Sequence, residues 1–246
     1  MRGISCIVCA YNEADRLGTI LQAIDAHPAL KEVIVVNDGS TDDTVALIDA
    51  FPNVRRVSYS ANRGKTYAMS KGIAAARGDQ LMFLDADLAG LGPREIDLLA
   101  APITSGRAKI SISLRRNSLF FYRMIGLDFV SGERVVPAWL LRDHAETMAT
   151  LPRWGGEAFI NQLIIEAKLP IEIVHWPGVT NIRKYQKMGR LRGLLAELRM
   201  VESALQILSP LALAGQVIGL RNLVVRSRPG FAKTTRARPW LSPWRI

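Results

Sequence analysis

The chain has 246 residues, of which 49% are hydrophobic, and this suffices for one large α/β domain with an appendage. With only two cysteines, a disulfide framework is excluded. The formal net charge of +10 is unevenly spread, because residues 182–246 hold 13 Lys or Arg against 2 Asp or Glu, whereas the first 181 residues hold 19 and 20. The basic C-terminal segment indicates an anionic partner, either a membrane or a nucleic acid.

Residues 4–10 form an apolar run that predicts a buried strand. The polar residues 11–13 end this run, so we expect no signal peptide. Cys6 and Cys9 lie on the predicted strand. No Gly/Pro turn or helix start comes immediately after them, which favours core packing over a redox pair and fits a reducing cytoplasm.

Predicted strands and helices alternate along the first 90 residues. After the first strand, apolar β-rich runs predict strands at residues 33–36, 54–59 and 80–84. Between them the sequence predicts helices at about residues 13–26, 44–50 and 66–76, with Asn12 as the cap of the first. Continuous apolar strands joined by helices and short loops indicate a parallel, doubly wound α/β sheet.

Polar side chains lie just after each of these strands. Neither a G-x-G-x-x-G after the first strand nor a Walker A pattern is present, which disfavours dehydrogenase and P-loop folds. The strand ends carry instead Glu13, Asp38, Arg63 with Lys65, and Asp85 with Asp87. Singly, each is readily explained as a cap or a surface charge. Together, at one edge of a parallel sheet, they predict a site for a metal-bound nucleotide.

Two carboxylates separated by one residue, Asp85 and Asp87, come directly after the strand at residues 80–84. Hard oxygen ligands at this short spacing suit Mg²⁺ or Mn²⁺, which can bridge a diphosphate. The alternative is an acidic turn that caps the helix starting near Pro93.

Four blocks in order, AYNE, VVNDGSTDDT, NRGKTYAMSKGIAAARGD and FLDADL, span residues 4–88 and resemble the family-2 glycosyltransferases with the GT-A fold. The resemblance implies a nucleoside diphosphate sugar as donor and a divalent cation as cofactor. It implies that Glu13 and Asp38 contact the base and ribose, and that Asp85 and Asp87 hold the metal. The implied nucleotide site comprises Ala10, Tyr11, Glu13, Asp38, Arg63, Lys65, Asp85 and Ala86.

The second half is expected to hold the acceptor. The sequence predicts a strand at residues 108–114, helices at residues 137–147 and beyond Glu157, and a last strand at residues 171–176. Residues 128–134, DFVSGER, resemble a D-x-x-S-G-x-R block of relatives that glycosylate polyprenyl phosphates. Arg134 is then a candidate phosphate ligand; the alternative is a helix-ending turn with a surface arginine.

Transfer to a hydroxyl needs a general base, for which Asp128, Glu133 and Glu157 are the candidates. A phosphate acceptor is already ionised and needs none. The basic loop with Arg183 and Lys187 resembles one that comes after the last strand in polyprenyl-phosphate transferases. It either clamps a donor or acceptor phosphate or is a solvated basic loop.

The metal site departs from the dolichol-phosphate mannosyltransferase pattern at one position. Ala89 stands where that pattern often has a glutamine. His175, at a predicted strand end, is the candidate replacement ligand, and packing beside Trp176 is the alternative.

Beyond residue 188, leucines recur at helical spacing, and residues 203–220 are an uncharged run of 18 residues. Pro210 and two glycines interrupt this run, so we expect two amphipathic helices lying in a membrane interface rather than one that spans it. Arginines and Trp240 and Trp244 come next, which favours an anionic leaflet. Packing on the catalytic domain or on a second subunit is the alternative, and the sequence has no nucleic-acid recognition motif.

The sequence therefore predicts a GT-A catalytic domain at residues 1–188, with a nucleotide-sugar half (1–90) and an acceptor half (91–188), and after it a basic, membrane-associating helical segment at 189–246. The expected activity is metal-dependent and transfers a sugar to a polyprenyl phosphate or other lipid head group on the cytoplasmic face of a membrane. Inversion at the anomeric carbon is implied by the family resemblance. A small soluble phosphorylated acceptor, and a non-catalytic membrane-associated scaffold, are the alternatives.

Overall fold

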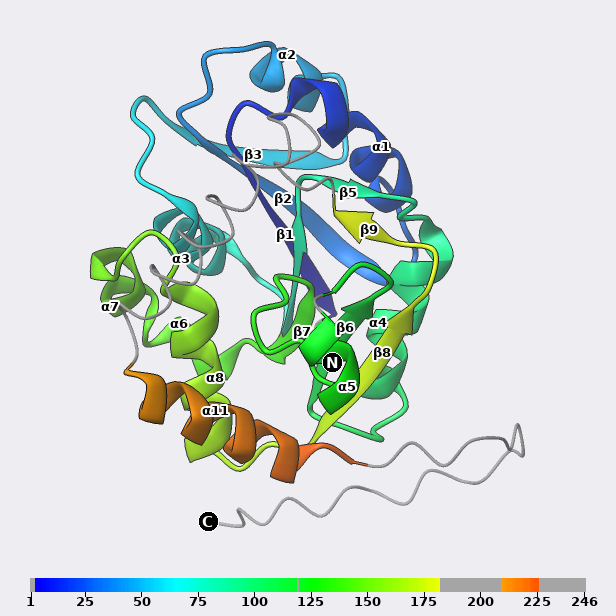
Figure 1. Ribbon diagram of the computed structural model, residues 1–246. Coiled ribbons are helices and arrows are strands. Elements are labelled where there is room, and N and C mark those ends of the chain that lie inside the picture. Colours follow the sequence, from blue (N-terminus) through cyan, green and yellow to red (C-terminus); the bar gives the residue numbers. More distant parts are fainter. Residues whose placement is uncertain (1–2, 119, 182–208, 226–246) are drawn as a thin grey trace.

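The computed structural model describes residues 3–118, 120–181 and 209–225, and these form three layers (Figure 1). The middle layer is a seven-stranded sheet with the order β3-β2-β1-β4-β7-β6-β8. Its strands are β1 (Ile4–Ala10), β2 (Leu30–Asp38), β3 (Val54–Tyr59), β4 (Gln80–Asp85), β6 (Ile110–Arg115), β7 (Arg134–Pro137) and β8 (Ile171–Trp176). All neighbouring pairs are parallel except the two that involve β7. The predicted α/β class with a mostly parallel, doubly wound sheet is confirmed.

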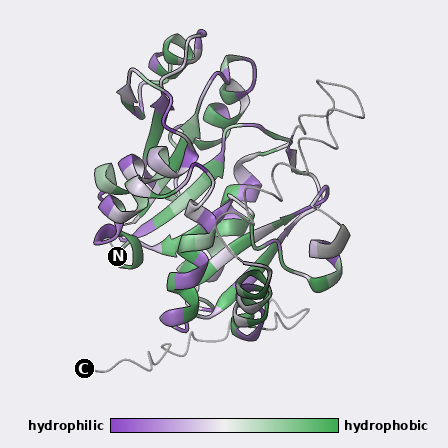
Figure 2. Ribbon diagram, turned by 60° about the vertical axis from the view of Figure 1, so that its left-hand side comes forward, coloured by the Kyte–Doolittle hydropathy of each residue, from purple (hydrophilic) through white to green (hydrophobic). Residues whose placement is uncertain are grey.

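Helices cover both faces of the sheet. One hydrophobic core lies under α1 (Ala14–Ile24), α2 (Thr44–Asp49) and α4 (Pro93–Thr104). The other lies under α3 (Lys65–Ala75), α6 (Trp139–Arg142), α7 (Ala145–Thr150), α8 (Gly156–Glu166) and α11 (Pro210–Leu223), and the short helix α5 (Phe120–Ile125) contacts its margin. Figure 2 shows the strands between these layers as predominantly hydrophobic. Burial on both faces explains why the strands are continuous apolar runs in the sequence.

Side chains along β1 alternate between the two faces of the sheet, and this separates its two cysteines. Cys6 packs in the core under α1, whereas Cys9 contacts the core under α3, so the two thiols point to opposite faces of the sheet. Both are free, and burial raises the pKa of each thiol, that of Cys9 to about 12. Core packing, rather than a redox pair, is therefore confirmed.

The helix predicted at residues 137–147 is confirmed in part, since its first residue, Pro137, ends strand β7 and helix starts at Trp139. Strand β7 (Arg134–Pro137) was not expected from the sequence, and it pairs antiparallel with β4 and β6 inside the sheet. Val135 and Val136 are fully buried on opposite faces, as β-branched residues of a central strand should be. Two short helices, α6 and α7, come after β7 in place of one, because the chain breaks helical geometry at His144.

The predicted cap of the first helix is also wrong. Helix α1 begins after Glu13, and Asn12 adopts a positive φ of 54°. The Asn12 side chain accepts a hydrogen bond from the amide of Thr41 at 2.8 Å, and the Glu13 amide donates to Thr44 Oγ1 at 2.9 Å. The loops after β1 and β2 therefore bond to each other, which a local capping rule does not anticipate.

Strand β8 is not the last strand, contrary to the expectation from the sequence. Residues Thr180–Asn181 form β9, which pairs antiparallel with β5 (Leu88–Ala89). Asn181 lies opposite Leu88, the residue after Asp87. The chain thus returns from the far edge of the sheet to the acidic turn at its centre.

Most of the C-terminal segment, including the leucine-rich run before residue 209 and the tryptophans near the end, lies outside the described residues. Helix α11 is described; it starts at Ser209, whose hydroxyl accepts a hydrogen bond from the Ala212 amide at 3.2 Å. No helix in the described part of the chain is long and apolar enough to cross a membrane.

Two helix glycines give a matched test of the packing. A methyl group built at Gly72 in α3 would lie 2.4 Å from Ile7 Cγ2, whereas one at Gly18 in α1 would lie 3.6 Å from its nearest neighbour, Leu47 Cδ1. We expect Gly18→Ala to raise the free energy of unfolding by about 0.5–1 kcal/mol, since alanine favours helix. Gly72→Ala should lower it by about 1–3 kcal/mol through overpacking. Urea unfolding measures both, and a stabilising Gly72→Ala would contradict the close approach of α3 to β1.

Candidate active site

Three of the predicted site residues come together around one ammonium group. Lys65 Nζ lies 2.6 Å from Asp85 Oδ1 and 2.7 Å from Glu157 Oε1. Lys65 is the first residue of α3, Asp85 ends β4, and Glu157 lies in the first turn of α8. Residues 20 and 92 positions away from Lys65 thus meet at the carboxyl edge of the sheet; the strand-end pattern predicted the meeting of Lys65 with Asp85, but not that of Lys65 with Glu157.

The charges at this junction support one another. Burial alone would lower the pKa of Lys65, but the carboxylates of Asp85 and Glu157 outweigh it and hold the pKa above its usual range. Burial likewise works to raise the pKa of Asp85, and the charges of Lys65 and Arg115 reverse this, so that the Asp85 pKa is lowered. Both groups are therefore ionised at neutral pH.

Asp38, at the end of β2, shapes the loop that leads into Lys65. Its two carboxylate oxygens accept hydrogen bonds from the amides of Arg63 at 2.7 Å and Gly64 at 2.8 Å, and from Asn62 Nδ2 at 3.1 Å. Gly64 has a φ of 96°, which favours glycine there. This loop directs α3, and with it Lys65, toward the centre of the sheet edge.

Arg63 itself is exposed and contacts an aromatic ring. Its guanidinium carbon lies 3.7 Å above the centroid of the Tyr67 ring, in a cation–π contact. Tyr67 in turn meets Tyr59 edge to face, with centroids 5.2 Å apart. The Arg63 side chain therefore lies at the β3 side of the site.

The loop before α8 is bonded to the start of α3. The Thr66 amide donates to the carbonyl of Arg153 at 3.1 Å, and Thr66 Oγ1 accepts from the Gly156 amide at 3.0 Å. These bonds fix the position of Glu157, the next residue. Glu157 is 7% exposed, so the pairing with Lys65 compensates a nearly buried carboxylate.

Arg115 lies among the acidic residues on the other side of Asp85. It was not among the site residues predicted from the sequence. It ends β6 at the same edge of the sheet, is 8% exposed and contacts the Glu133 carboxylate directly. Its guanidinium lies 3.7 Å from Asp128 Oδ2 and 3.9 Å from Asp85 Oδ2. The strand-end rule applied to β6 would have found it.

Glu133 and Asp128, two of the candidate bases, face inward. Glu133 is fully buried and accepts hydrogen bonds from the hydroxyls of Ser113 and Ser131, each at 2.7 Å. Asp128 is 2% exposed and accepts from the Ser118 hydroxyl at 2.7 Å. Burial raises the pKa of both carboxyl groups, against the opposing charge of Arg115.

Arg134 is not the surface arginine that the sequence left as an alternative. Its side chain is fully buried, donates from Nε to the Ser131 carbonyl at 3.0 Å, and donates to Asn161 Oδ1 at 2.9 Å. Asn161 also donates to the Phe129 carbonyl at 2.8 Å. Among the described residues, the partners of Arg134 are thus atoms of the loop before β7 and of α8, and burial lowers its pKa.

Asp87 has a different environment from Asp85. Within the described part of the chain no cation pairs with its carboxylate. Burial, and next the negative charges of Asp85 and Glu13, raise the pKa of Asp87 to about 6. Negative charges therefore outweigh positive ones around Asp87, the second carboxylate of the pair.

The backbone of Gly132 lies against the Asp85 carboxylate. A methyl group built on Gly132 would lie 2.2 Å from Asp85 Oδ1 and 2.7 Å from its carboxyl carbon. A side chain at position 132 would fit only if the Asp85 carboxylate moved away. The Ser131-Gly132 turn thus determines where the Asp85 carboxylate can lie.

The remaining predicted residues take several positions. Ala10 and Ala86 are buried in the core under α1, so only their backbone atoms can face a ligand. Tyr11 is 44% exposed, and Glu13 forms an ion pair of 2.6 Å with Arg16. Arg183 and Lys187 lie outside the described residues.

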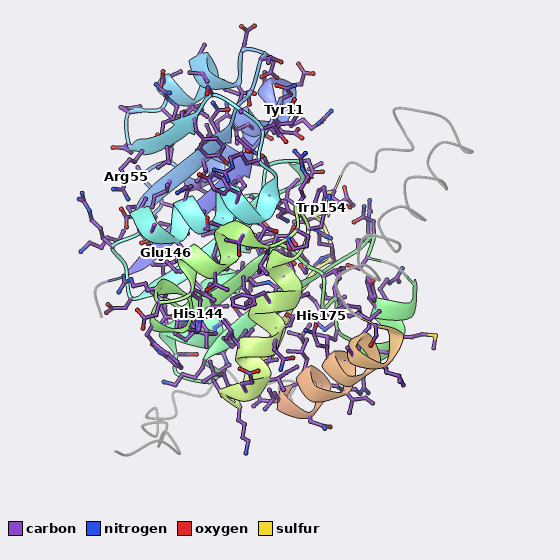
Figure 3. The ribbon with its side chains drawn as sticks, turned by 90° about the vertical axis from the view of Figure 1, so that its left-hand side faces the viewer. Tyr11, Arg55, His144, Glu146, Trp154 and His175 are labelled. Atoms are coloured by element: carbon purple, nitrogen blue, oxygen red, sulfur yellow. The ribbon has the colours of Figure 1, made fainter. Side chains whose placement is uncertain are left out.

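His175 is exposed on the edge strand β8, and it lies well below Tyr11 and Trp154 in Figure 3. Among the residues that the structure describes, no group of three or more His, Cys, Asp and Glu side chains is arranged to hold a metal by itself. The metal-ligand role of His175 therefore stays a prediction.

Comparisons with known proteins agree with this geometry. Residues 5–118 match the model of glycosyl transferase family 2. The chain is 42% identical over 90 residues to the succinoglycan biosynthesis protein ExoO of Rhizobium meliloti, covering 34% of this chain and 25% of that protein. It is 35% identical over 91 residues to the poly-beta-1,6-N-acetyl-D-glucosamine synthase of Staphylococcus epidermidis, covering 35% and 22%. The chain thus spans about a quarter of the length of these relatives.

A solved structure matches over a larger part of the chain. Glucosyl-3-phosphoglycerate synthase from Mycobacterium tuberculosis, in complex with Mn²⁺ and uridine-diphosphate-glucose, superposes with a TM-score of 0.64 at 25% identity, covering 84% of this chain and 79% of that one. The same enzyme with phosphoglyceric acid gives a TM-score of 0.65 at 24% identity, covering 84% and 80%. Residues 5–118 thus match a glycosyltransferase family 2 domain, and the described sheet as a whole has the GT-A fold of the superposed synthase.

Proposed function

We propose that this chain is a divalent-metal-dependent glycosyltransferase that takes a sugar from a nucleoside diphosphate sugar. One observation carries the proposal: Asp85 and Asp87 lie at the end of the central strand β4, at the sheet edge where Lys65 and the loop held by Asp38 also lie. This edge is where open α/β sheets bind nucleotides. The Mn²⁺ and uridine-diphosphate-glucose in the superposed synthase support the same chemistry here.

The residues present fit a divalent cation. Asp87 offers carboxylate oxygens, which Mg²⁺ and Mn²⁺ prefer, and the negative charges of Asp85 and Glu13 that raise its pKa would favour a bound cation. Asp85 is already paired with Lys65, so Asp87 is the proposed principal ligand and Asp85 the second. When bound, such an ion stabilises the charge that develops on a leaving diphosphate.

The chain's own residues then bind and orient the donor. Lys65 is proposed to interact with the nucleotide as a fixed cation held by Asp85 and Glu157. Glu13 and Asp38 are proposed to contact the base and ribose, since Asp38 ends β2 at this edge of the sheet. Tyr11 at the exposed rim and Arg63 beside Tyr67 complete the proposed nucleoside end.

Among the candidate bases, Glu157 is the one we favour for a hydroxyl acceptor. It lies in the first turn of α8 against Lys65, whereas Glu133 has no exposed surface and Asp128 has 2%. A base must come within hydrogen-bond reach of the proton that it takes. Inversion at the anomeric carbon is proposed only on the family likeness.

The acceptor is proposed to be a lipid phosphate or another lipid head group at the cytoplasmic face of a membrane. The basic, leucine-rich sequence after residue 181 supports this, and Asn181, the last described residue before it, lies opposite Leu88 next to the acidic turn. From that point Arg183 and Lys187 are proposed to bind a donor or acceptor phosphate.

A soluble phosphorylated acceptor is the second candidate. It is favoured by the superposed synthase, whose structures contain phosphoglyceric acid. Mass spectrometry of the products formed from a panel of nucleotide sugars separates the two candidates. A product only with polyprenyl phosphate or membrane extract supports a lipid acceptor, and a product only with a small phosphorylated acceptor refutes it.

Removal of the proposed metal ligand tests the activity. We expect Asp87→Ala to lower metal-dependent sugar transfer by at least about 10²-fold, because the charge on the leaving diphosphate would lose its stabilisation. Asp15→Ala, at an exposed position in the first turn of α1, is the matched control and should retain activity. Undiminished transfer by Asp87→Ala would remove Asp87 from the metal site.

The raised pKa of Asp87 gives a prediction for stability without metal. The folded chain binds this proton up to about pH 6, whereas the unfolded chain loses it near pH 4, so the free energy of unfolding should fall as pH rises through that window. Asp87→Asn should remove this fall and be more stable than the parent at pH 7.5 by about 1–3 kcal/mol. Urea unfolding in chelator at several pH values measures it. If parent and variant were equally stable at every pH, the raised pKa of Asp87 and the excess of negative charge around it would be contradicted.

A third variant tests the position of Asp85. Gly132→Ala should displace the Asp85 carboxylate, so we expect kcat/KM for transfer to fall by roughly 10-fold to 10²-fold, since small misplacements of site groups are costly. Gly178→Ala, where a methyl group has no neighbour within 4 Å, is the control and should leave kcat/KM unchanged. Parent-like kinetics for Gly132→Ala would show that the approach of Gly132 to Asp85 does not matter.

A further inference from the structure

Helix α11 is fixed to the catalytic domain along one side. Gln216 Nε2 donates to the Ala158 carbonyl at 2.8 Å, and Leu220 is fully buried. A methyl group built on Gly219 would lie 3.0 Å from Ile165 Cδ1, so the helix backbone approaches α8 closely. After the helix, the Val225 amide donates to the Ile171 carbonyl of β8 at 2.8 Å.

The opposite side of α11 is apolar and exposed. Leu211 is 86% and Ile218 is 61% exposed, and between them Ala214 and Gly215 are exposed on the same side. A helix that faces water normally presents polar residues there. Helix α1 does so, with Asp15, Thr19 and Gln22 exposed. The exposed apolar side of α11 is therefore unusual within this chain.

Helix α5 extends the exposed apolar surface. It lies close to one end of α11 in Figure 1, and the Arg221 guanidinium donates to the Ile125 carbonyl at the end of α5. Met124, the preceding residue, is 65% exposed. We call the exposed surface formed by Met124, Leu211, Ala214, Gly215 and Ile218 the α11 patch. Arg123 and Arg221, both exposed, adjoin it.

The sequence on both sides of α11 is net basic. Residues 182–208 hold six Lys or Arg and two Glu, and residues 226–246 hold six Lys or Arg and no acid. Exposed apolar side chains flanked by arginines are suited to the boundary between the head groups and acyl chains of anionic lipids.

A second copy of the chain fits the same surface less well. A two-fold contact through the α11 patch would bring Arg123 and Arg221 of one copy toward the same arginines of the other. Like charges disfavour such a contact, and the more so at low salt.

We propose that the α11 patch binds the surface of an anionic lipid bilayer. This proposal extends the lipid-acceptor function proposed above. Only the reason for membrane binding, delivery of the site to a lipid acceptor, rests on that function. Gln216 of α11 bonds to Ala158, the residue after Glu157, so α11 would lie directly between the bilayer and α8, the helix that carries a site residue. Membrane binding would then hold the site close to acceptors embedded in the lipid.

Vesicle sedimentation of the full chain tests the proposal, with phosphatidylcholine vesicles and with vesicles that also contain phosphatidylglycerol. The parent should bind only the anionic vesicles, and the double variant Leu211→Glu/Ile218→Glu should bind them at least about tenfold more weakly. Leu98→Glu is the control, because Leu98 is a partly exposed leucine of α4 on the other side of the sheet, and it should bind as the parent does. Parent-like binding by the double variant, or equal binding of neutral vesicles by the parent, would overturn the proposal.

A fluorescent label on α11 reports contact with the bilayer and avoids the charge that the glutamate substitutions introduce. Both native cysteines have raised thiol pKa values and one is fully buried, so a label sensitive to polarity should react at the introduced thiol of Ile218→Cys. Its emission should shift to the blue on anionic vesicles, whereas a label at Leu98→Cys should not. No shift at position 218, or a shift caused by self-association without vesicles, would overturn the proposal.

Calorimetric titration with uridine diphosphate and Mn²⁺ is run on the same samples. Nucleotide binding without vesicle binding would refute the membrane surface alone. Vesicle binding without nucleotide binding would refute the proposed donor chemistry alone.

Discussion

The ammonium group of Lys65, held between Asp85 and Glu157, is the interaction on which the arrangement of this site depends. It connects three elements, α3, β4 and α8, that are far apart in the sequence. Glu157 is nearly buried, and a buried carboxylate without a partner is strongly destabilising. The bonds that Asp38 accepts from the loop of residues 62–64, and those between Thr66 and the loop before α8, bring Lys65 to this position.

The two carboxylates of the D-x-D turn differ because of this interaction. Asp85 is neutralised by Lys65 on one side and approached by Arg115 on the other, so it stays ionised in a partly buried position. No cation of the described residues forms an ion pair with Asp87, and burial and the charges of Asp85 and Glu13 outweigh that of Lys65 and raise its pKa. Groups held in unfavourable surroundings are characteristic of functional sites, where stability is given up for binding. A bound cation would relieve the unfavourable charge at Asp87.

Much of this arrangement could be predicted from the sequence, for a physical reason. Parallel strands end at one edge, so polar residues at successive strand ends must approach one another, and Asp38, Lys65 and Asp85 do. Strand β7 was missed because four residues ending in proline show no period, and its antiparallel pairing with β4 and β6 is non-local. Arg115 was missed because the strand-end rule was not carried into the second half. The inward orientation of Arg134 depends on Asn161 and on the Ser131 carbonyl, which no local pattern specifies.

The central claim is that Asp87 holds a divalent cation at the sheet edge beside Lys65. The most direct measurement is anomalous X-ray scattering from crystals of the chain grown with Mn²⁺ and a nucleoside diphosphate. The account predicts an anomalous peak about 2.1 Å from an Asp87 oxygen, with the diphosphate at the same edge. A nucleotide bound at another place, or a Mn²⁺ peak away from Asp87, would contradict it.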